Sequence, residues 1–180
     1  MNKLLTTFLT ALLLGCTADT FAQHDVALKT NALYWGTTTP NASLEVGLGR
    51  QTSAEVLLAY NPWTFSDDRK MRFWLVQPEY RYWFCETFEG HFVGIHAHGA
   101  QFFGGFKSKR YDGWLAGAGL TYGYNWILSP HWNLEAAIGL GFARLWYKQS
   151  PRIPCSKCHQ DKTKTYIGPT KAALSIVYLF

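Results

Sequence analysis

The residues best suited to chemistry form the CSKCH string at residues 155–159. Thiolates and imidazole are good zinc and copper ligands, so a metal clip of Cys155, Cys158 and His159 is one interpretation. A second ligand pair at suitable spacing is missing. The string also matches a c-type haem attachment sequence, but the segment offers no packed haem pocket. In an oxidising compartment we predict a Cys155–Cys158 disulfide, with no metal or cofactor.

Three histidines form a second group, at His91, His96 and His98. His96 and His98 would share one strand face, about 7 Å apart. A third ligand from a neighbouring strand could complete a metal site. We expect hydrogen bonds to glutamate side chains as the commoner outcome.

Ser129 lies close to His131 in the sequence, and Ser108 is a second candidate nucleophile. These residues could serve an acyl hydrolase or transferase that acts on envelope lipids. Neither serine lies in a recognisable nucleophile motif, and a catalytic triad requires geometry as well as residue type. Turn formation explains Ser129-Pro130-His131. We therefore predict that the protein is not an enzyme and keep the lipid-modifying enzyme as the alternative.

The segments that position these residues alternate apolar and polar side chains with a period of two, which indicates β-strands. Pro78 lies on the apolar face of the fourth segment and predicts a bulge or kink there. Seven tryptophans lie near predicted segment ends, as an aromatic girdle requires. The eight segments are residues 25–35, 42–49, 53–61, 71–84, 91–103, 113–127, 132–147 and 168–180.

The last segment ends on Phe180 and would leave a bare edge in an open sheet. In a closed barrel this strand pairs with the first one, and the edge disappears. Its alternate residues Ile176, Tyr178 and Phe180 resemble the C-terminal signal read by the barrel assembly machinery of bacterial outer membranes.

The predicted connections alternate in length, which is typical of outer-membrane barrels with short periplasmic turns. The fold class that we predict is all-β: a single eight-stranded antiparallel transmembrane β-barrel with short periplasmic turns, longer extracellular loops and periplasmic termini. The short connections are residues 50–52, 85–90 and 128–131, and the longer ones are 36–41, 62–70, 104–112 and 148–165.

If the apolar faces meet lipid, the barrel interior receives seven charged residues, four acidic and three basic. An eight-stranded barrel is barely wider than its own side chains. We therefore predict a salt-bridged plug rather than an open pore, with an ion or proton path through Glu79 and Arg81 as the alternative. The seven residues are Lys29, Glu45, Glu55, Glu79, Arg81, Glu135 and Lys171.

The N-terminus reads as a signal peptide over residues 1–22, with Lys3, a short apolar core and a small-residue cleavage site. The core is shorter than the roughly 20 residues of a spanning helix. Alternatively, the LLGC string ending at Cys16 resembles a lipobox, which would lipidate Cys16. The barrel domain covers residues 23–180, and Cys85 in its short turn would remain unpaired.

The composition fits one domain of 180 residues with 17% aromatic and 16% charged side chains. A soluble aromatic-rich β-sandwich is the alternative fold. The net charge of +5 comes from scattered residues, so we predict no nucleic-acid partner.

Several strings, among them YNPWTFSDDRK, WLVQPEYRYW and GPTKAALSIVYLF, resemble the Bacteroidota family known as domain of unknown function 3575. The resemblance covers nearly all of the chain after the signal. It implies an outer-membrane barrel of the Gram-negative envelope, sometimes encoded among fimbrial genes, with no established activity and no catalytic residues.

These observations predict a non-catalytic outer-membrane protein whose surface loops bind a ligand or partner. Outer-membrane lipid, the assembly machinery and a surface or fimbrial protein are the expected partners. Loops on a rigid scaffold commonly carry binding. The expected binding segments include Trp63, Phe65, residues 106–112 and the cysteine-containing loop.

Overall fold

The computed structural model describes residues 26–65, 69–106, 109–151 and 160–180. Within these ranges the fold is all-β except for one short helix. The elements are β1 (Val26–Asn31), α2 (Ala32–Gly36), β2 (Asn41–Gly49), β3 (Thr52–Asn61), β4 (Thr64–Phe65), β5 (Arg69–Trp83), β6 (Gly90–Phe106), β7 (Lys109–Ser129), β8 (Trp132–Pro151) and β9 (Gln160–Leu179).

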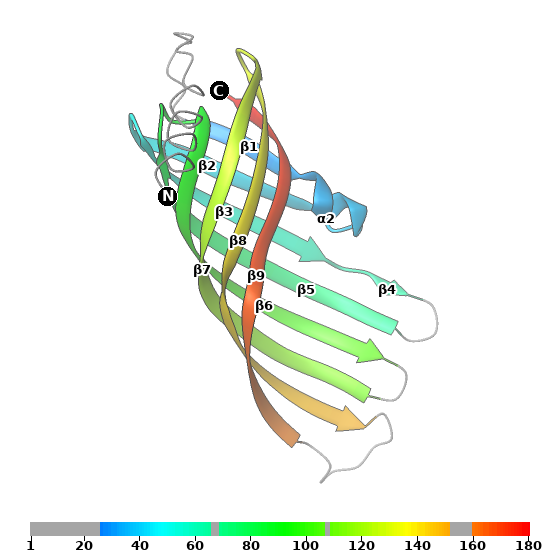
Figure 1. Ribbon diagram of the computed structural model, residues 1–180. Helices are drawn as coiled ribbons and strands as arrows, with labels where there is room; N and C mark the ends of the chain where they lie inside the picture. Colours follow the sequence, from blue (N-terminus) through cyan, green and yellow to red (C-terminus); the bar gives the residue numbers. More distant parts are fainter. Residues whose placement is uncertain (1–25, 66–68, 107–108, 152–159) are drawn as a thin grey trace, which may run out of the picture.

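Eight of the strands form a closed antiparallel ring (Figure 1). Each strand pairs with its neighbour in the chain, β3 pairs with β5, and β1 closes the ring by pairing with β9. The two-residue strand β4 pairs with β5 beside the ring. The all-β class, the eight antiparallel ring strands and the pairing of the last strand with the first are confirmed.

The strands are strongly tilted relative to the ring axis. A path of cross-strand partners that begins at Leu179 returns to β9 at Gly168, 11 residues earlier (179 − 168 = 11). Such an offset is the geometric signature of tilted strands in a closed sheet. The path passes through Ala27, Glu45, Glu55, Glu79, His96, Gly119 and Gly141.

The two ends of the ring differ. Ala27 pairs with Leu179 at the end that also carries the turns at residues 50–51, 84–89 and 130–131, which we call the near end. The predicted short turns are confirmed there. At the opposite, far end, strands β5 to β9 continue beyond β1, β2 and β3 (Figure 1).

The expected long loops at the far end are largely strand, which corrects the sequence prediction. Most of residues 104–112 belong to the ends of β6 and β7, and residues 160–165 belong to β9. Continuous pairing from Phe106↔Lys109 and from Gln149↔Gln160 satisfies the backbone of these polar segments. Residues 66–68, 107–108 and 152–159 lie outside the described ranges.

The first predicted strand is also too long, because β1 ends at Asn31 and a helical turn follows. The Asn31 side chain caps α2 by accepting a hydrogen bond from the Leu33 N–H at 3.0 Å. It also accepts one from the Leu174 N–H at 3.1 Å and donates one to the Ala172 carbonyl at 3.0 Å. One side chain thus starts the helix and joins it to β9.

The bulge predicted at Pro78 is wrong, since the register is continuous on both sides of it. Val56 pairs with Pro78 on β3, and toward β6 the pairs Val76↔Gly99 and Glu79↔His96 share one register. Pro78 has no backbone N–H to donate, so the hydrogen bonding between β5 and β6 is interrupted only locally. Register shifts lie instead at Gly47/Gly49, Ile127/Ser129 and Gly139/Leu140.

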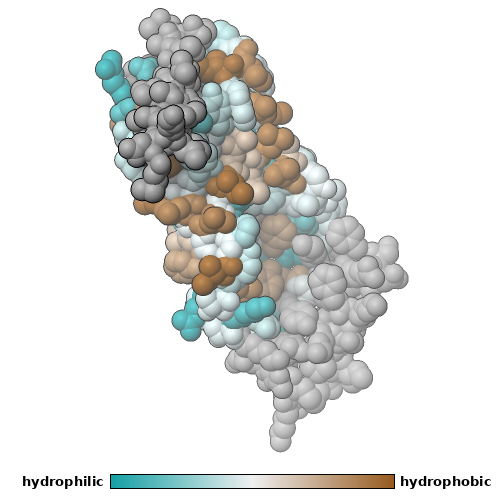
Figure 2. Space-filling view, in the orientation of Figure 1, coloured by the Kyte–Doolittle hydropathy of each residue, from teal (hydrophilic) through white to brown (hydrophobic). Residues whose placement is uncertain are grey.

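The buried polar and charged side chains lie inside the ring, and the outer face is apolar. Burial alternates along much of the eight ring strands, and large apolar residues such as Leu44, Ile95 and Leu140 are exposed on the outer face. Figure 2 shows hydrophobic residues spread over the visible outer face. No helix in the described ranges has the length and apolar character needed to cross a membrane.

Candidate functional site

The structure brings the seven charged residues predicted to face inward into one buried ion-pair network. Their side chains are 0 to 5 % exposed. They come from β1, β2, β3, β5, β8 and β9. The members are Lys29, Glu45, Glu55, Glu79, Arg81, Glu135 and Lys171.

Arg81 is the centre of this network and contacts all four glutamates. Its Nε donates to Glu79 Oε1 at 2.8 Å, and its Nη1 lies 2.9 Å from both Glu45 Oε2 and Glu135 Oε2. Its Nη2 pairs with Glu55. The fixed fork of guanidinium donors suits this arrangement, which an ammonium group could not reproduce.

Two lysines, one on either side of Arg81, offset part of the remaining negative charge. Lys29 Nζ lies 2.5 Å from Glu135 Oε2 and also pairs with Glu45. Lys171 Nζ lies 2.6 Å from Glu79 Oε2 and 3.8 Å from Glu55 Oε2. Three cations therefore face four carboxylates, so the network carries a formal charge of −1 (3 − 4 = −1).

Uncharged side chains extend the network to the two remaining strands. Thr121 of β7 donates to Glu79 Oε2 at 3.2 Å, and His96 Nδ1 of β6 lies 2.8 Å from Thr121 Oγ1. His96 Nε2 lies 2.9 Å from Thr170 Oγ1. Every strand of the ring thus contributes a side chain. Sequence reasoning placed His96 on the inward face but did not connect Thr121 and Thr170 to it.

An apolar cluster fills the near end of the ring, between the ion-pair network and the short turns. Trp83, Phe88 and Phe92 pack together there with small and aliphatic residues from β1, β8 and β9. The Trp83 indole N–H donates to Ser53 Oγ at 2.8 Å, and the Arg81 guanidinium lies 4.4 Å from the Phe92 ring centroid. The aromatic cluster and the ion-pair network are therefore continuous.

Inward-facing glycines make room for these large side chains. A Cβ on Gly94 would lie 2.8 Å from Glu79 Oε1, and one on Gly119 would lie 2.8 Å from the His96 ring. These distances are shorter than van der Waals contact, so any side chain would displace the network. The glycines of β6 and β7 thus serve packing.

The arrangement is suited to holding neighbouring strands together. Glu45, Glu55 and Glu79 are direct cross-strand neighbours, and like charges in such positions destabilise a sheet. Buried charges are tolerated only when they are paired and hydrogen-bonded. The ion pairs therefore bind neighbouring strands to each other in one register.

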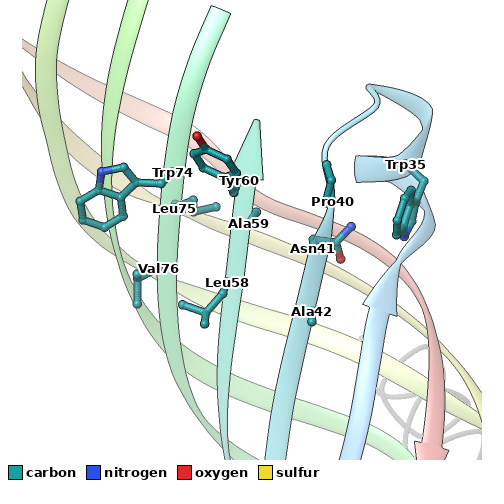
Figure 3. A pocket seen from close by; sticks show the side chains of 10 residues that line it. All are labelled: Trp35, Pro40, Asn41, Ala42, Leu58, Ala59, Tyr60, Trp74, Leu75 and Val76. Atoms are coloured by element: carbon teal, nitrogen blue, oxygen red, sulfur yellow. The ribbon is translucent and has the colours of Figure 1, made fainter. Parts of the chain in front are cut away.

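Two shallow apolar grooves lie on the outer face. One has a volume of about 550 Å³ and is walled by Trp35 of α2 and by Tyr60 and Trp74, over a floor that includes Ala42 and Leu58 (Figure 3). The other, of about 640 Å³, runs over β5 to β8 between tyrosine and aliphatic side chains. Their apolar walls suit hydrocarbon chains.

The other candidate residues do not join the network. The His91 ring lies on the outer face, where Nδ1 is 2.7 Å from the Tyr122 hydroxyl, so the three histidines are not one group. His131 is exposed in its turn and stacks on Tyr178, with ring centroids 6.1 Å apart. Ser129 ends β7 beside it, and Ser108 lies outside the described residues.

The cysteine predictions are corrected in one respect. Cys85 is disulfide-bonded, so the prediction that it stays unpaired is wrong. Sequence spacing does not show which cysteines folding brings together. Cys16, Cys155, Cys158 and His159 lie outside the described residues, so the disulfide and the metal clip there remain untested. Within the described ranges, His, Cys, Asp and Glu form no group arranged to hold a metal ion.

The predicted C-terminal signal lies at the near end, on the outer face of β9. Ile176 is exposed, and Tyr178 contacts Trp132 and Phe180 edge to face, with centroids 5.0 Å apart in both pairs. The Phe180 N–H donates to the Val26 carbonyl at 3.1 Å. The last residues therefore complete the seam between β9 and β1.

Comparison with known proteins gives one match. Neither the curated proteins nor the solved structures contain a significant match to this chain. The family described as "Protein of unknown function (DUF3575)" matches residues 6–180, nearly the whole chain. The chain therefore belongs to the DUF3575 family, as its sequence resemblance predicted.

Proposed function

We propose that this protein is a transmembrane β-barrel of the Gram-negative outer membrane that anchors a partner at the cell surface and has no catalytic role. The observation that carries the proposal is the inverted polarity of the ring. Charged and amide side chains are buried inside it, whereas Leu, Ile, Val and aromatic side chains are exposed around it. In water this arrangement would expose an apolar band, which hydrocarbon would cover.

The dimensions of the apolar band support this location. Trp126 and Trp114 of β7 are both exposed on the outer face, 12 residues apart (126 − 114 = 12). That spacing is about 40 Å along a strand, or roughly 30 Å of height at a tilt of about 40°. The outer leaflet girdle would then comprise Trp74, Trp114 and Trp146. Trp114 pairs with Trp146, and the Trp74 and Trp114 rings meet edge to face with centroids 5.4 Å apart.

The filled interior favours an anchor over a pore. The ion-pair network and the aromatic cluster occupy the near half of the ring with side chains from every strand. Rigid cross-linking of this kind supports a scaffold for binding segments. The near end, with the short turns, would face the periplasm, and the far end would face the medium.

The extended strands at the far end would present the binding surface. Beyond the proposed outer girdle, Arg72, Asp112 and Lys148 replace apolar residues on the outer face. Trp63 is exposed beside β4, and its indole N–H donates to the Thr38 carbonyl at 2.5 Å. Charged and aromatic groups on a rigid sheet suit a protein partner, such as a subunit of a surface or fimbrial assembly.

The membrane location is tested by gel mobility and protease shaving. Protein from purified outer membranes should migrate differently before and after boiling, and protease on intact cells should cleave only far-end connections such as residues 62–68. A soluble periplasmic protein with no mobility shift would contradict the proposal.

The partner-binding role is tested by crosslinking in the membrane. A photo-crosslinking residue at Trp63 or Lys148 should capture a surface protein, whereas the same residue at Leu128, beside the near-end turn, should not. Unchanged surface assembly after removal of residues 63–68 and no far-end crosslink would contradict the role.

A further inference from the structure

The inner wall of the far half of the ring is apolar over β5 to β8, in contrast to the charged near half, and on β9 it continues from Leu145 to Lys164. Leu75, Ala100, Leu115 and Leu145 are successive cross-strand partners on the inward face of β5 to β8. In the next inward-facing row toward the far end, Phe73 pairs with Phe102. Leu57 and Ala59 of β3 continue this wall.

The exposure of this wall shows that small molecules can reach it. Inward residues of the near half, such as Trp83 and Arg81, are fully buried. The inward residues Phe73, Leu75 and Leu115 are partly exposed although they face the ring axis. Side chains therefore fill the near half but leave the far half open to an occupant.

Two buried polar groups form the floor where the apolar wall meets the network. Gln77 and His98 are 2 % and 8 % exposed. The register of Val76↔Gly99 and Glu79↔His96 places them opposite each other on β5 and β6. Among the described residues, Gln77 Nε2 and His98 Nδ1 have no hydrogen-bond partner. Such atoms call for a ligand group or water.

The neighbouring charges select the kind of head group. Lys164 of β9 lies one row farther toward the far end than Gln77, in the row of Leu75 and Leu145. The network next to Gln77 has four carboxylates and three cations, so an anionic head group placed against Gln77 would be repelled. Its three cations are already engaged. An uncharged hydroxyl fits the two orphan atoms, because it can accept from the Gln77 amide and donate to a neutral His98 nitrogen.

We propose that the far half of the ring binds a single-chain amphiphile with an uncharged hydroxyl head group, an inference that goes beyond the proposed anchoring function. The head group meets Gln77 and His98, and the alkyl chain lies along Leu75, Leu115 and Phe73. The wall from Gln77 to Phe73 covers about 13 Å along the strand. This length suits a medium-length alkyl chain.

The proposal is tested with 1-decanol and isotope-labelled protein in phospholipid nanodiscs. Titration should shift the His98 ring nitrogen signals with a saturable, one-site dependence. Gln77→Leu and Ala100→Trp should each weaken binding at least tenfold, the first by removing the donor and the second by filling the space beside Leu115. Decanoate should bind at least tenfold more weakly than decanol.

Gln101→Leu is the matched control, because Gln101 faces outward, where its Oε1 accepts from the Trp74 indole at 3.1 Å. It should leave decanol binding unchanged. The proposal would be overturned by shifts that rise linearly without saturation, or by shifts that persist in both inward variants. It would also be overturned if the chain's own far-end connections already occupied the wall. Each variant is first checked for the boiling-dependent gel shift, so loss of binding is distinguished from loss of the barrel.

Discussion

Arg81 is the side chain on which the interior of the ring depends most. It lies in direct contact with Glu45, Glu55, Glu79 and Glu135 and with no solvent. The two lysines alone cannot balance four carboxylates in a medium that solvates charge poorly. Loss of Arg81 would leave uncompensated negative charge in three neighbouring strands.

Arg81→Met is expected to lower the free energy of unfolding by about 3–5 kcal/mol, the usual cost of breaking a buried ion pair. Urea unfolding of the refolded protein in lipid vesicles measures this. Adding Glu55→Gln to the variant should restore part of the loss, because it removes one unpaired charge.

Arg144→Met is the control for this substitution, since Arg144 is exposed and its guanidinium lies 5.5 Å from the Trp146 ring. Its loss should cost about 1 kcal/mol or less. Equal effects of the two substitutions would show that the interior network does not stabilise the ring.

At the scale of the strand, the inward residues of β7 must be small, whereas its outward residues have room for a larger side chain. Gly119 faces inward against His96, and Ala118 faces outward. Gly119→Val is expected to destabilise the fold by about 1–3 kcal/mol or more through overpacking. Ala118→Val should be nearly neutral. Parallel urea titrations compare them, and equal stability of both variants would mean that His96 can move aside.

The last strand combines a structural and a proposed targeting role at Phe180. Its backbone bond to Val26 survives a side-chain change, whereas its ring contact with Tyr178 does not. Phe180→Ala is therefore expected to reduce the amount assembled in the outer membrane several-fold while the purified protein still refolds in vitro. Immunoblots of membrane fractions, compared with refolding yields, measure this. Wild-type amounts in the membrane would contradict the assembly-signal hypothesis.

At the scale of the whole molecule, Leu120 and Leu128 provide a test of the membrane proposal. They are equally exposed, at 67 % and 66 %, but Leu120 lies in the middle of the apolar band and Leu128 beside the near-end turn. Leu120→Arg is expected to cost about 2–4 kcal/mol in lipid and Leu128→Arg about 1 kcal/mol or less, because the cost of arginine depends on depth. Unfolding titrations in vesicles give both values. Similar, small costs would indicate that the outer face meets water.

The sequence by itself determined which residues share a face of each regularly alternating strand segment. Side chains of a strand alternate with a period of two whatever the strand pairs with. This local rule placed Lys29, Glu79 and Lys171 on inward faces, and it required no knowledge of pairing. The all-β class, the short turns and the closing strand followed from the same periodicity and from the breakers between segments.

Only the tertiary structure decided what those faces meet and where the elements stop. The Asn31 side chain ends β1 through hydrogen bonds to Ala172 and Leu174, which lie 141 and 143 positions away along the chain. The far-end strands persist because neighbours pair with them, and Pro78 keeps its register because β3 holds it. Contacts between distant residues depend on pairing and tilt, which no local pattern encodes.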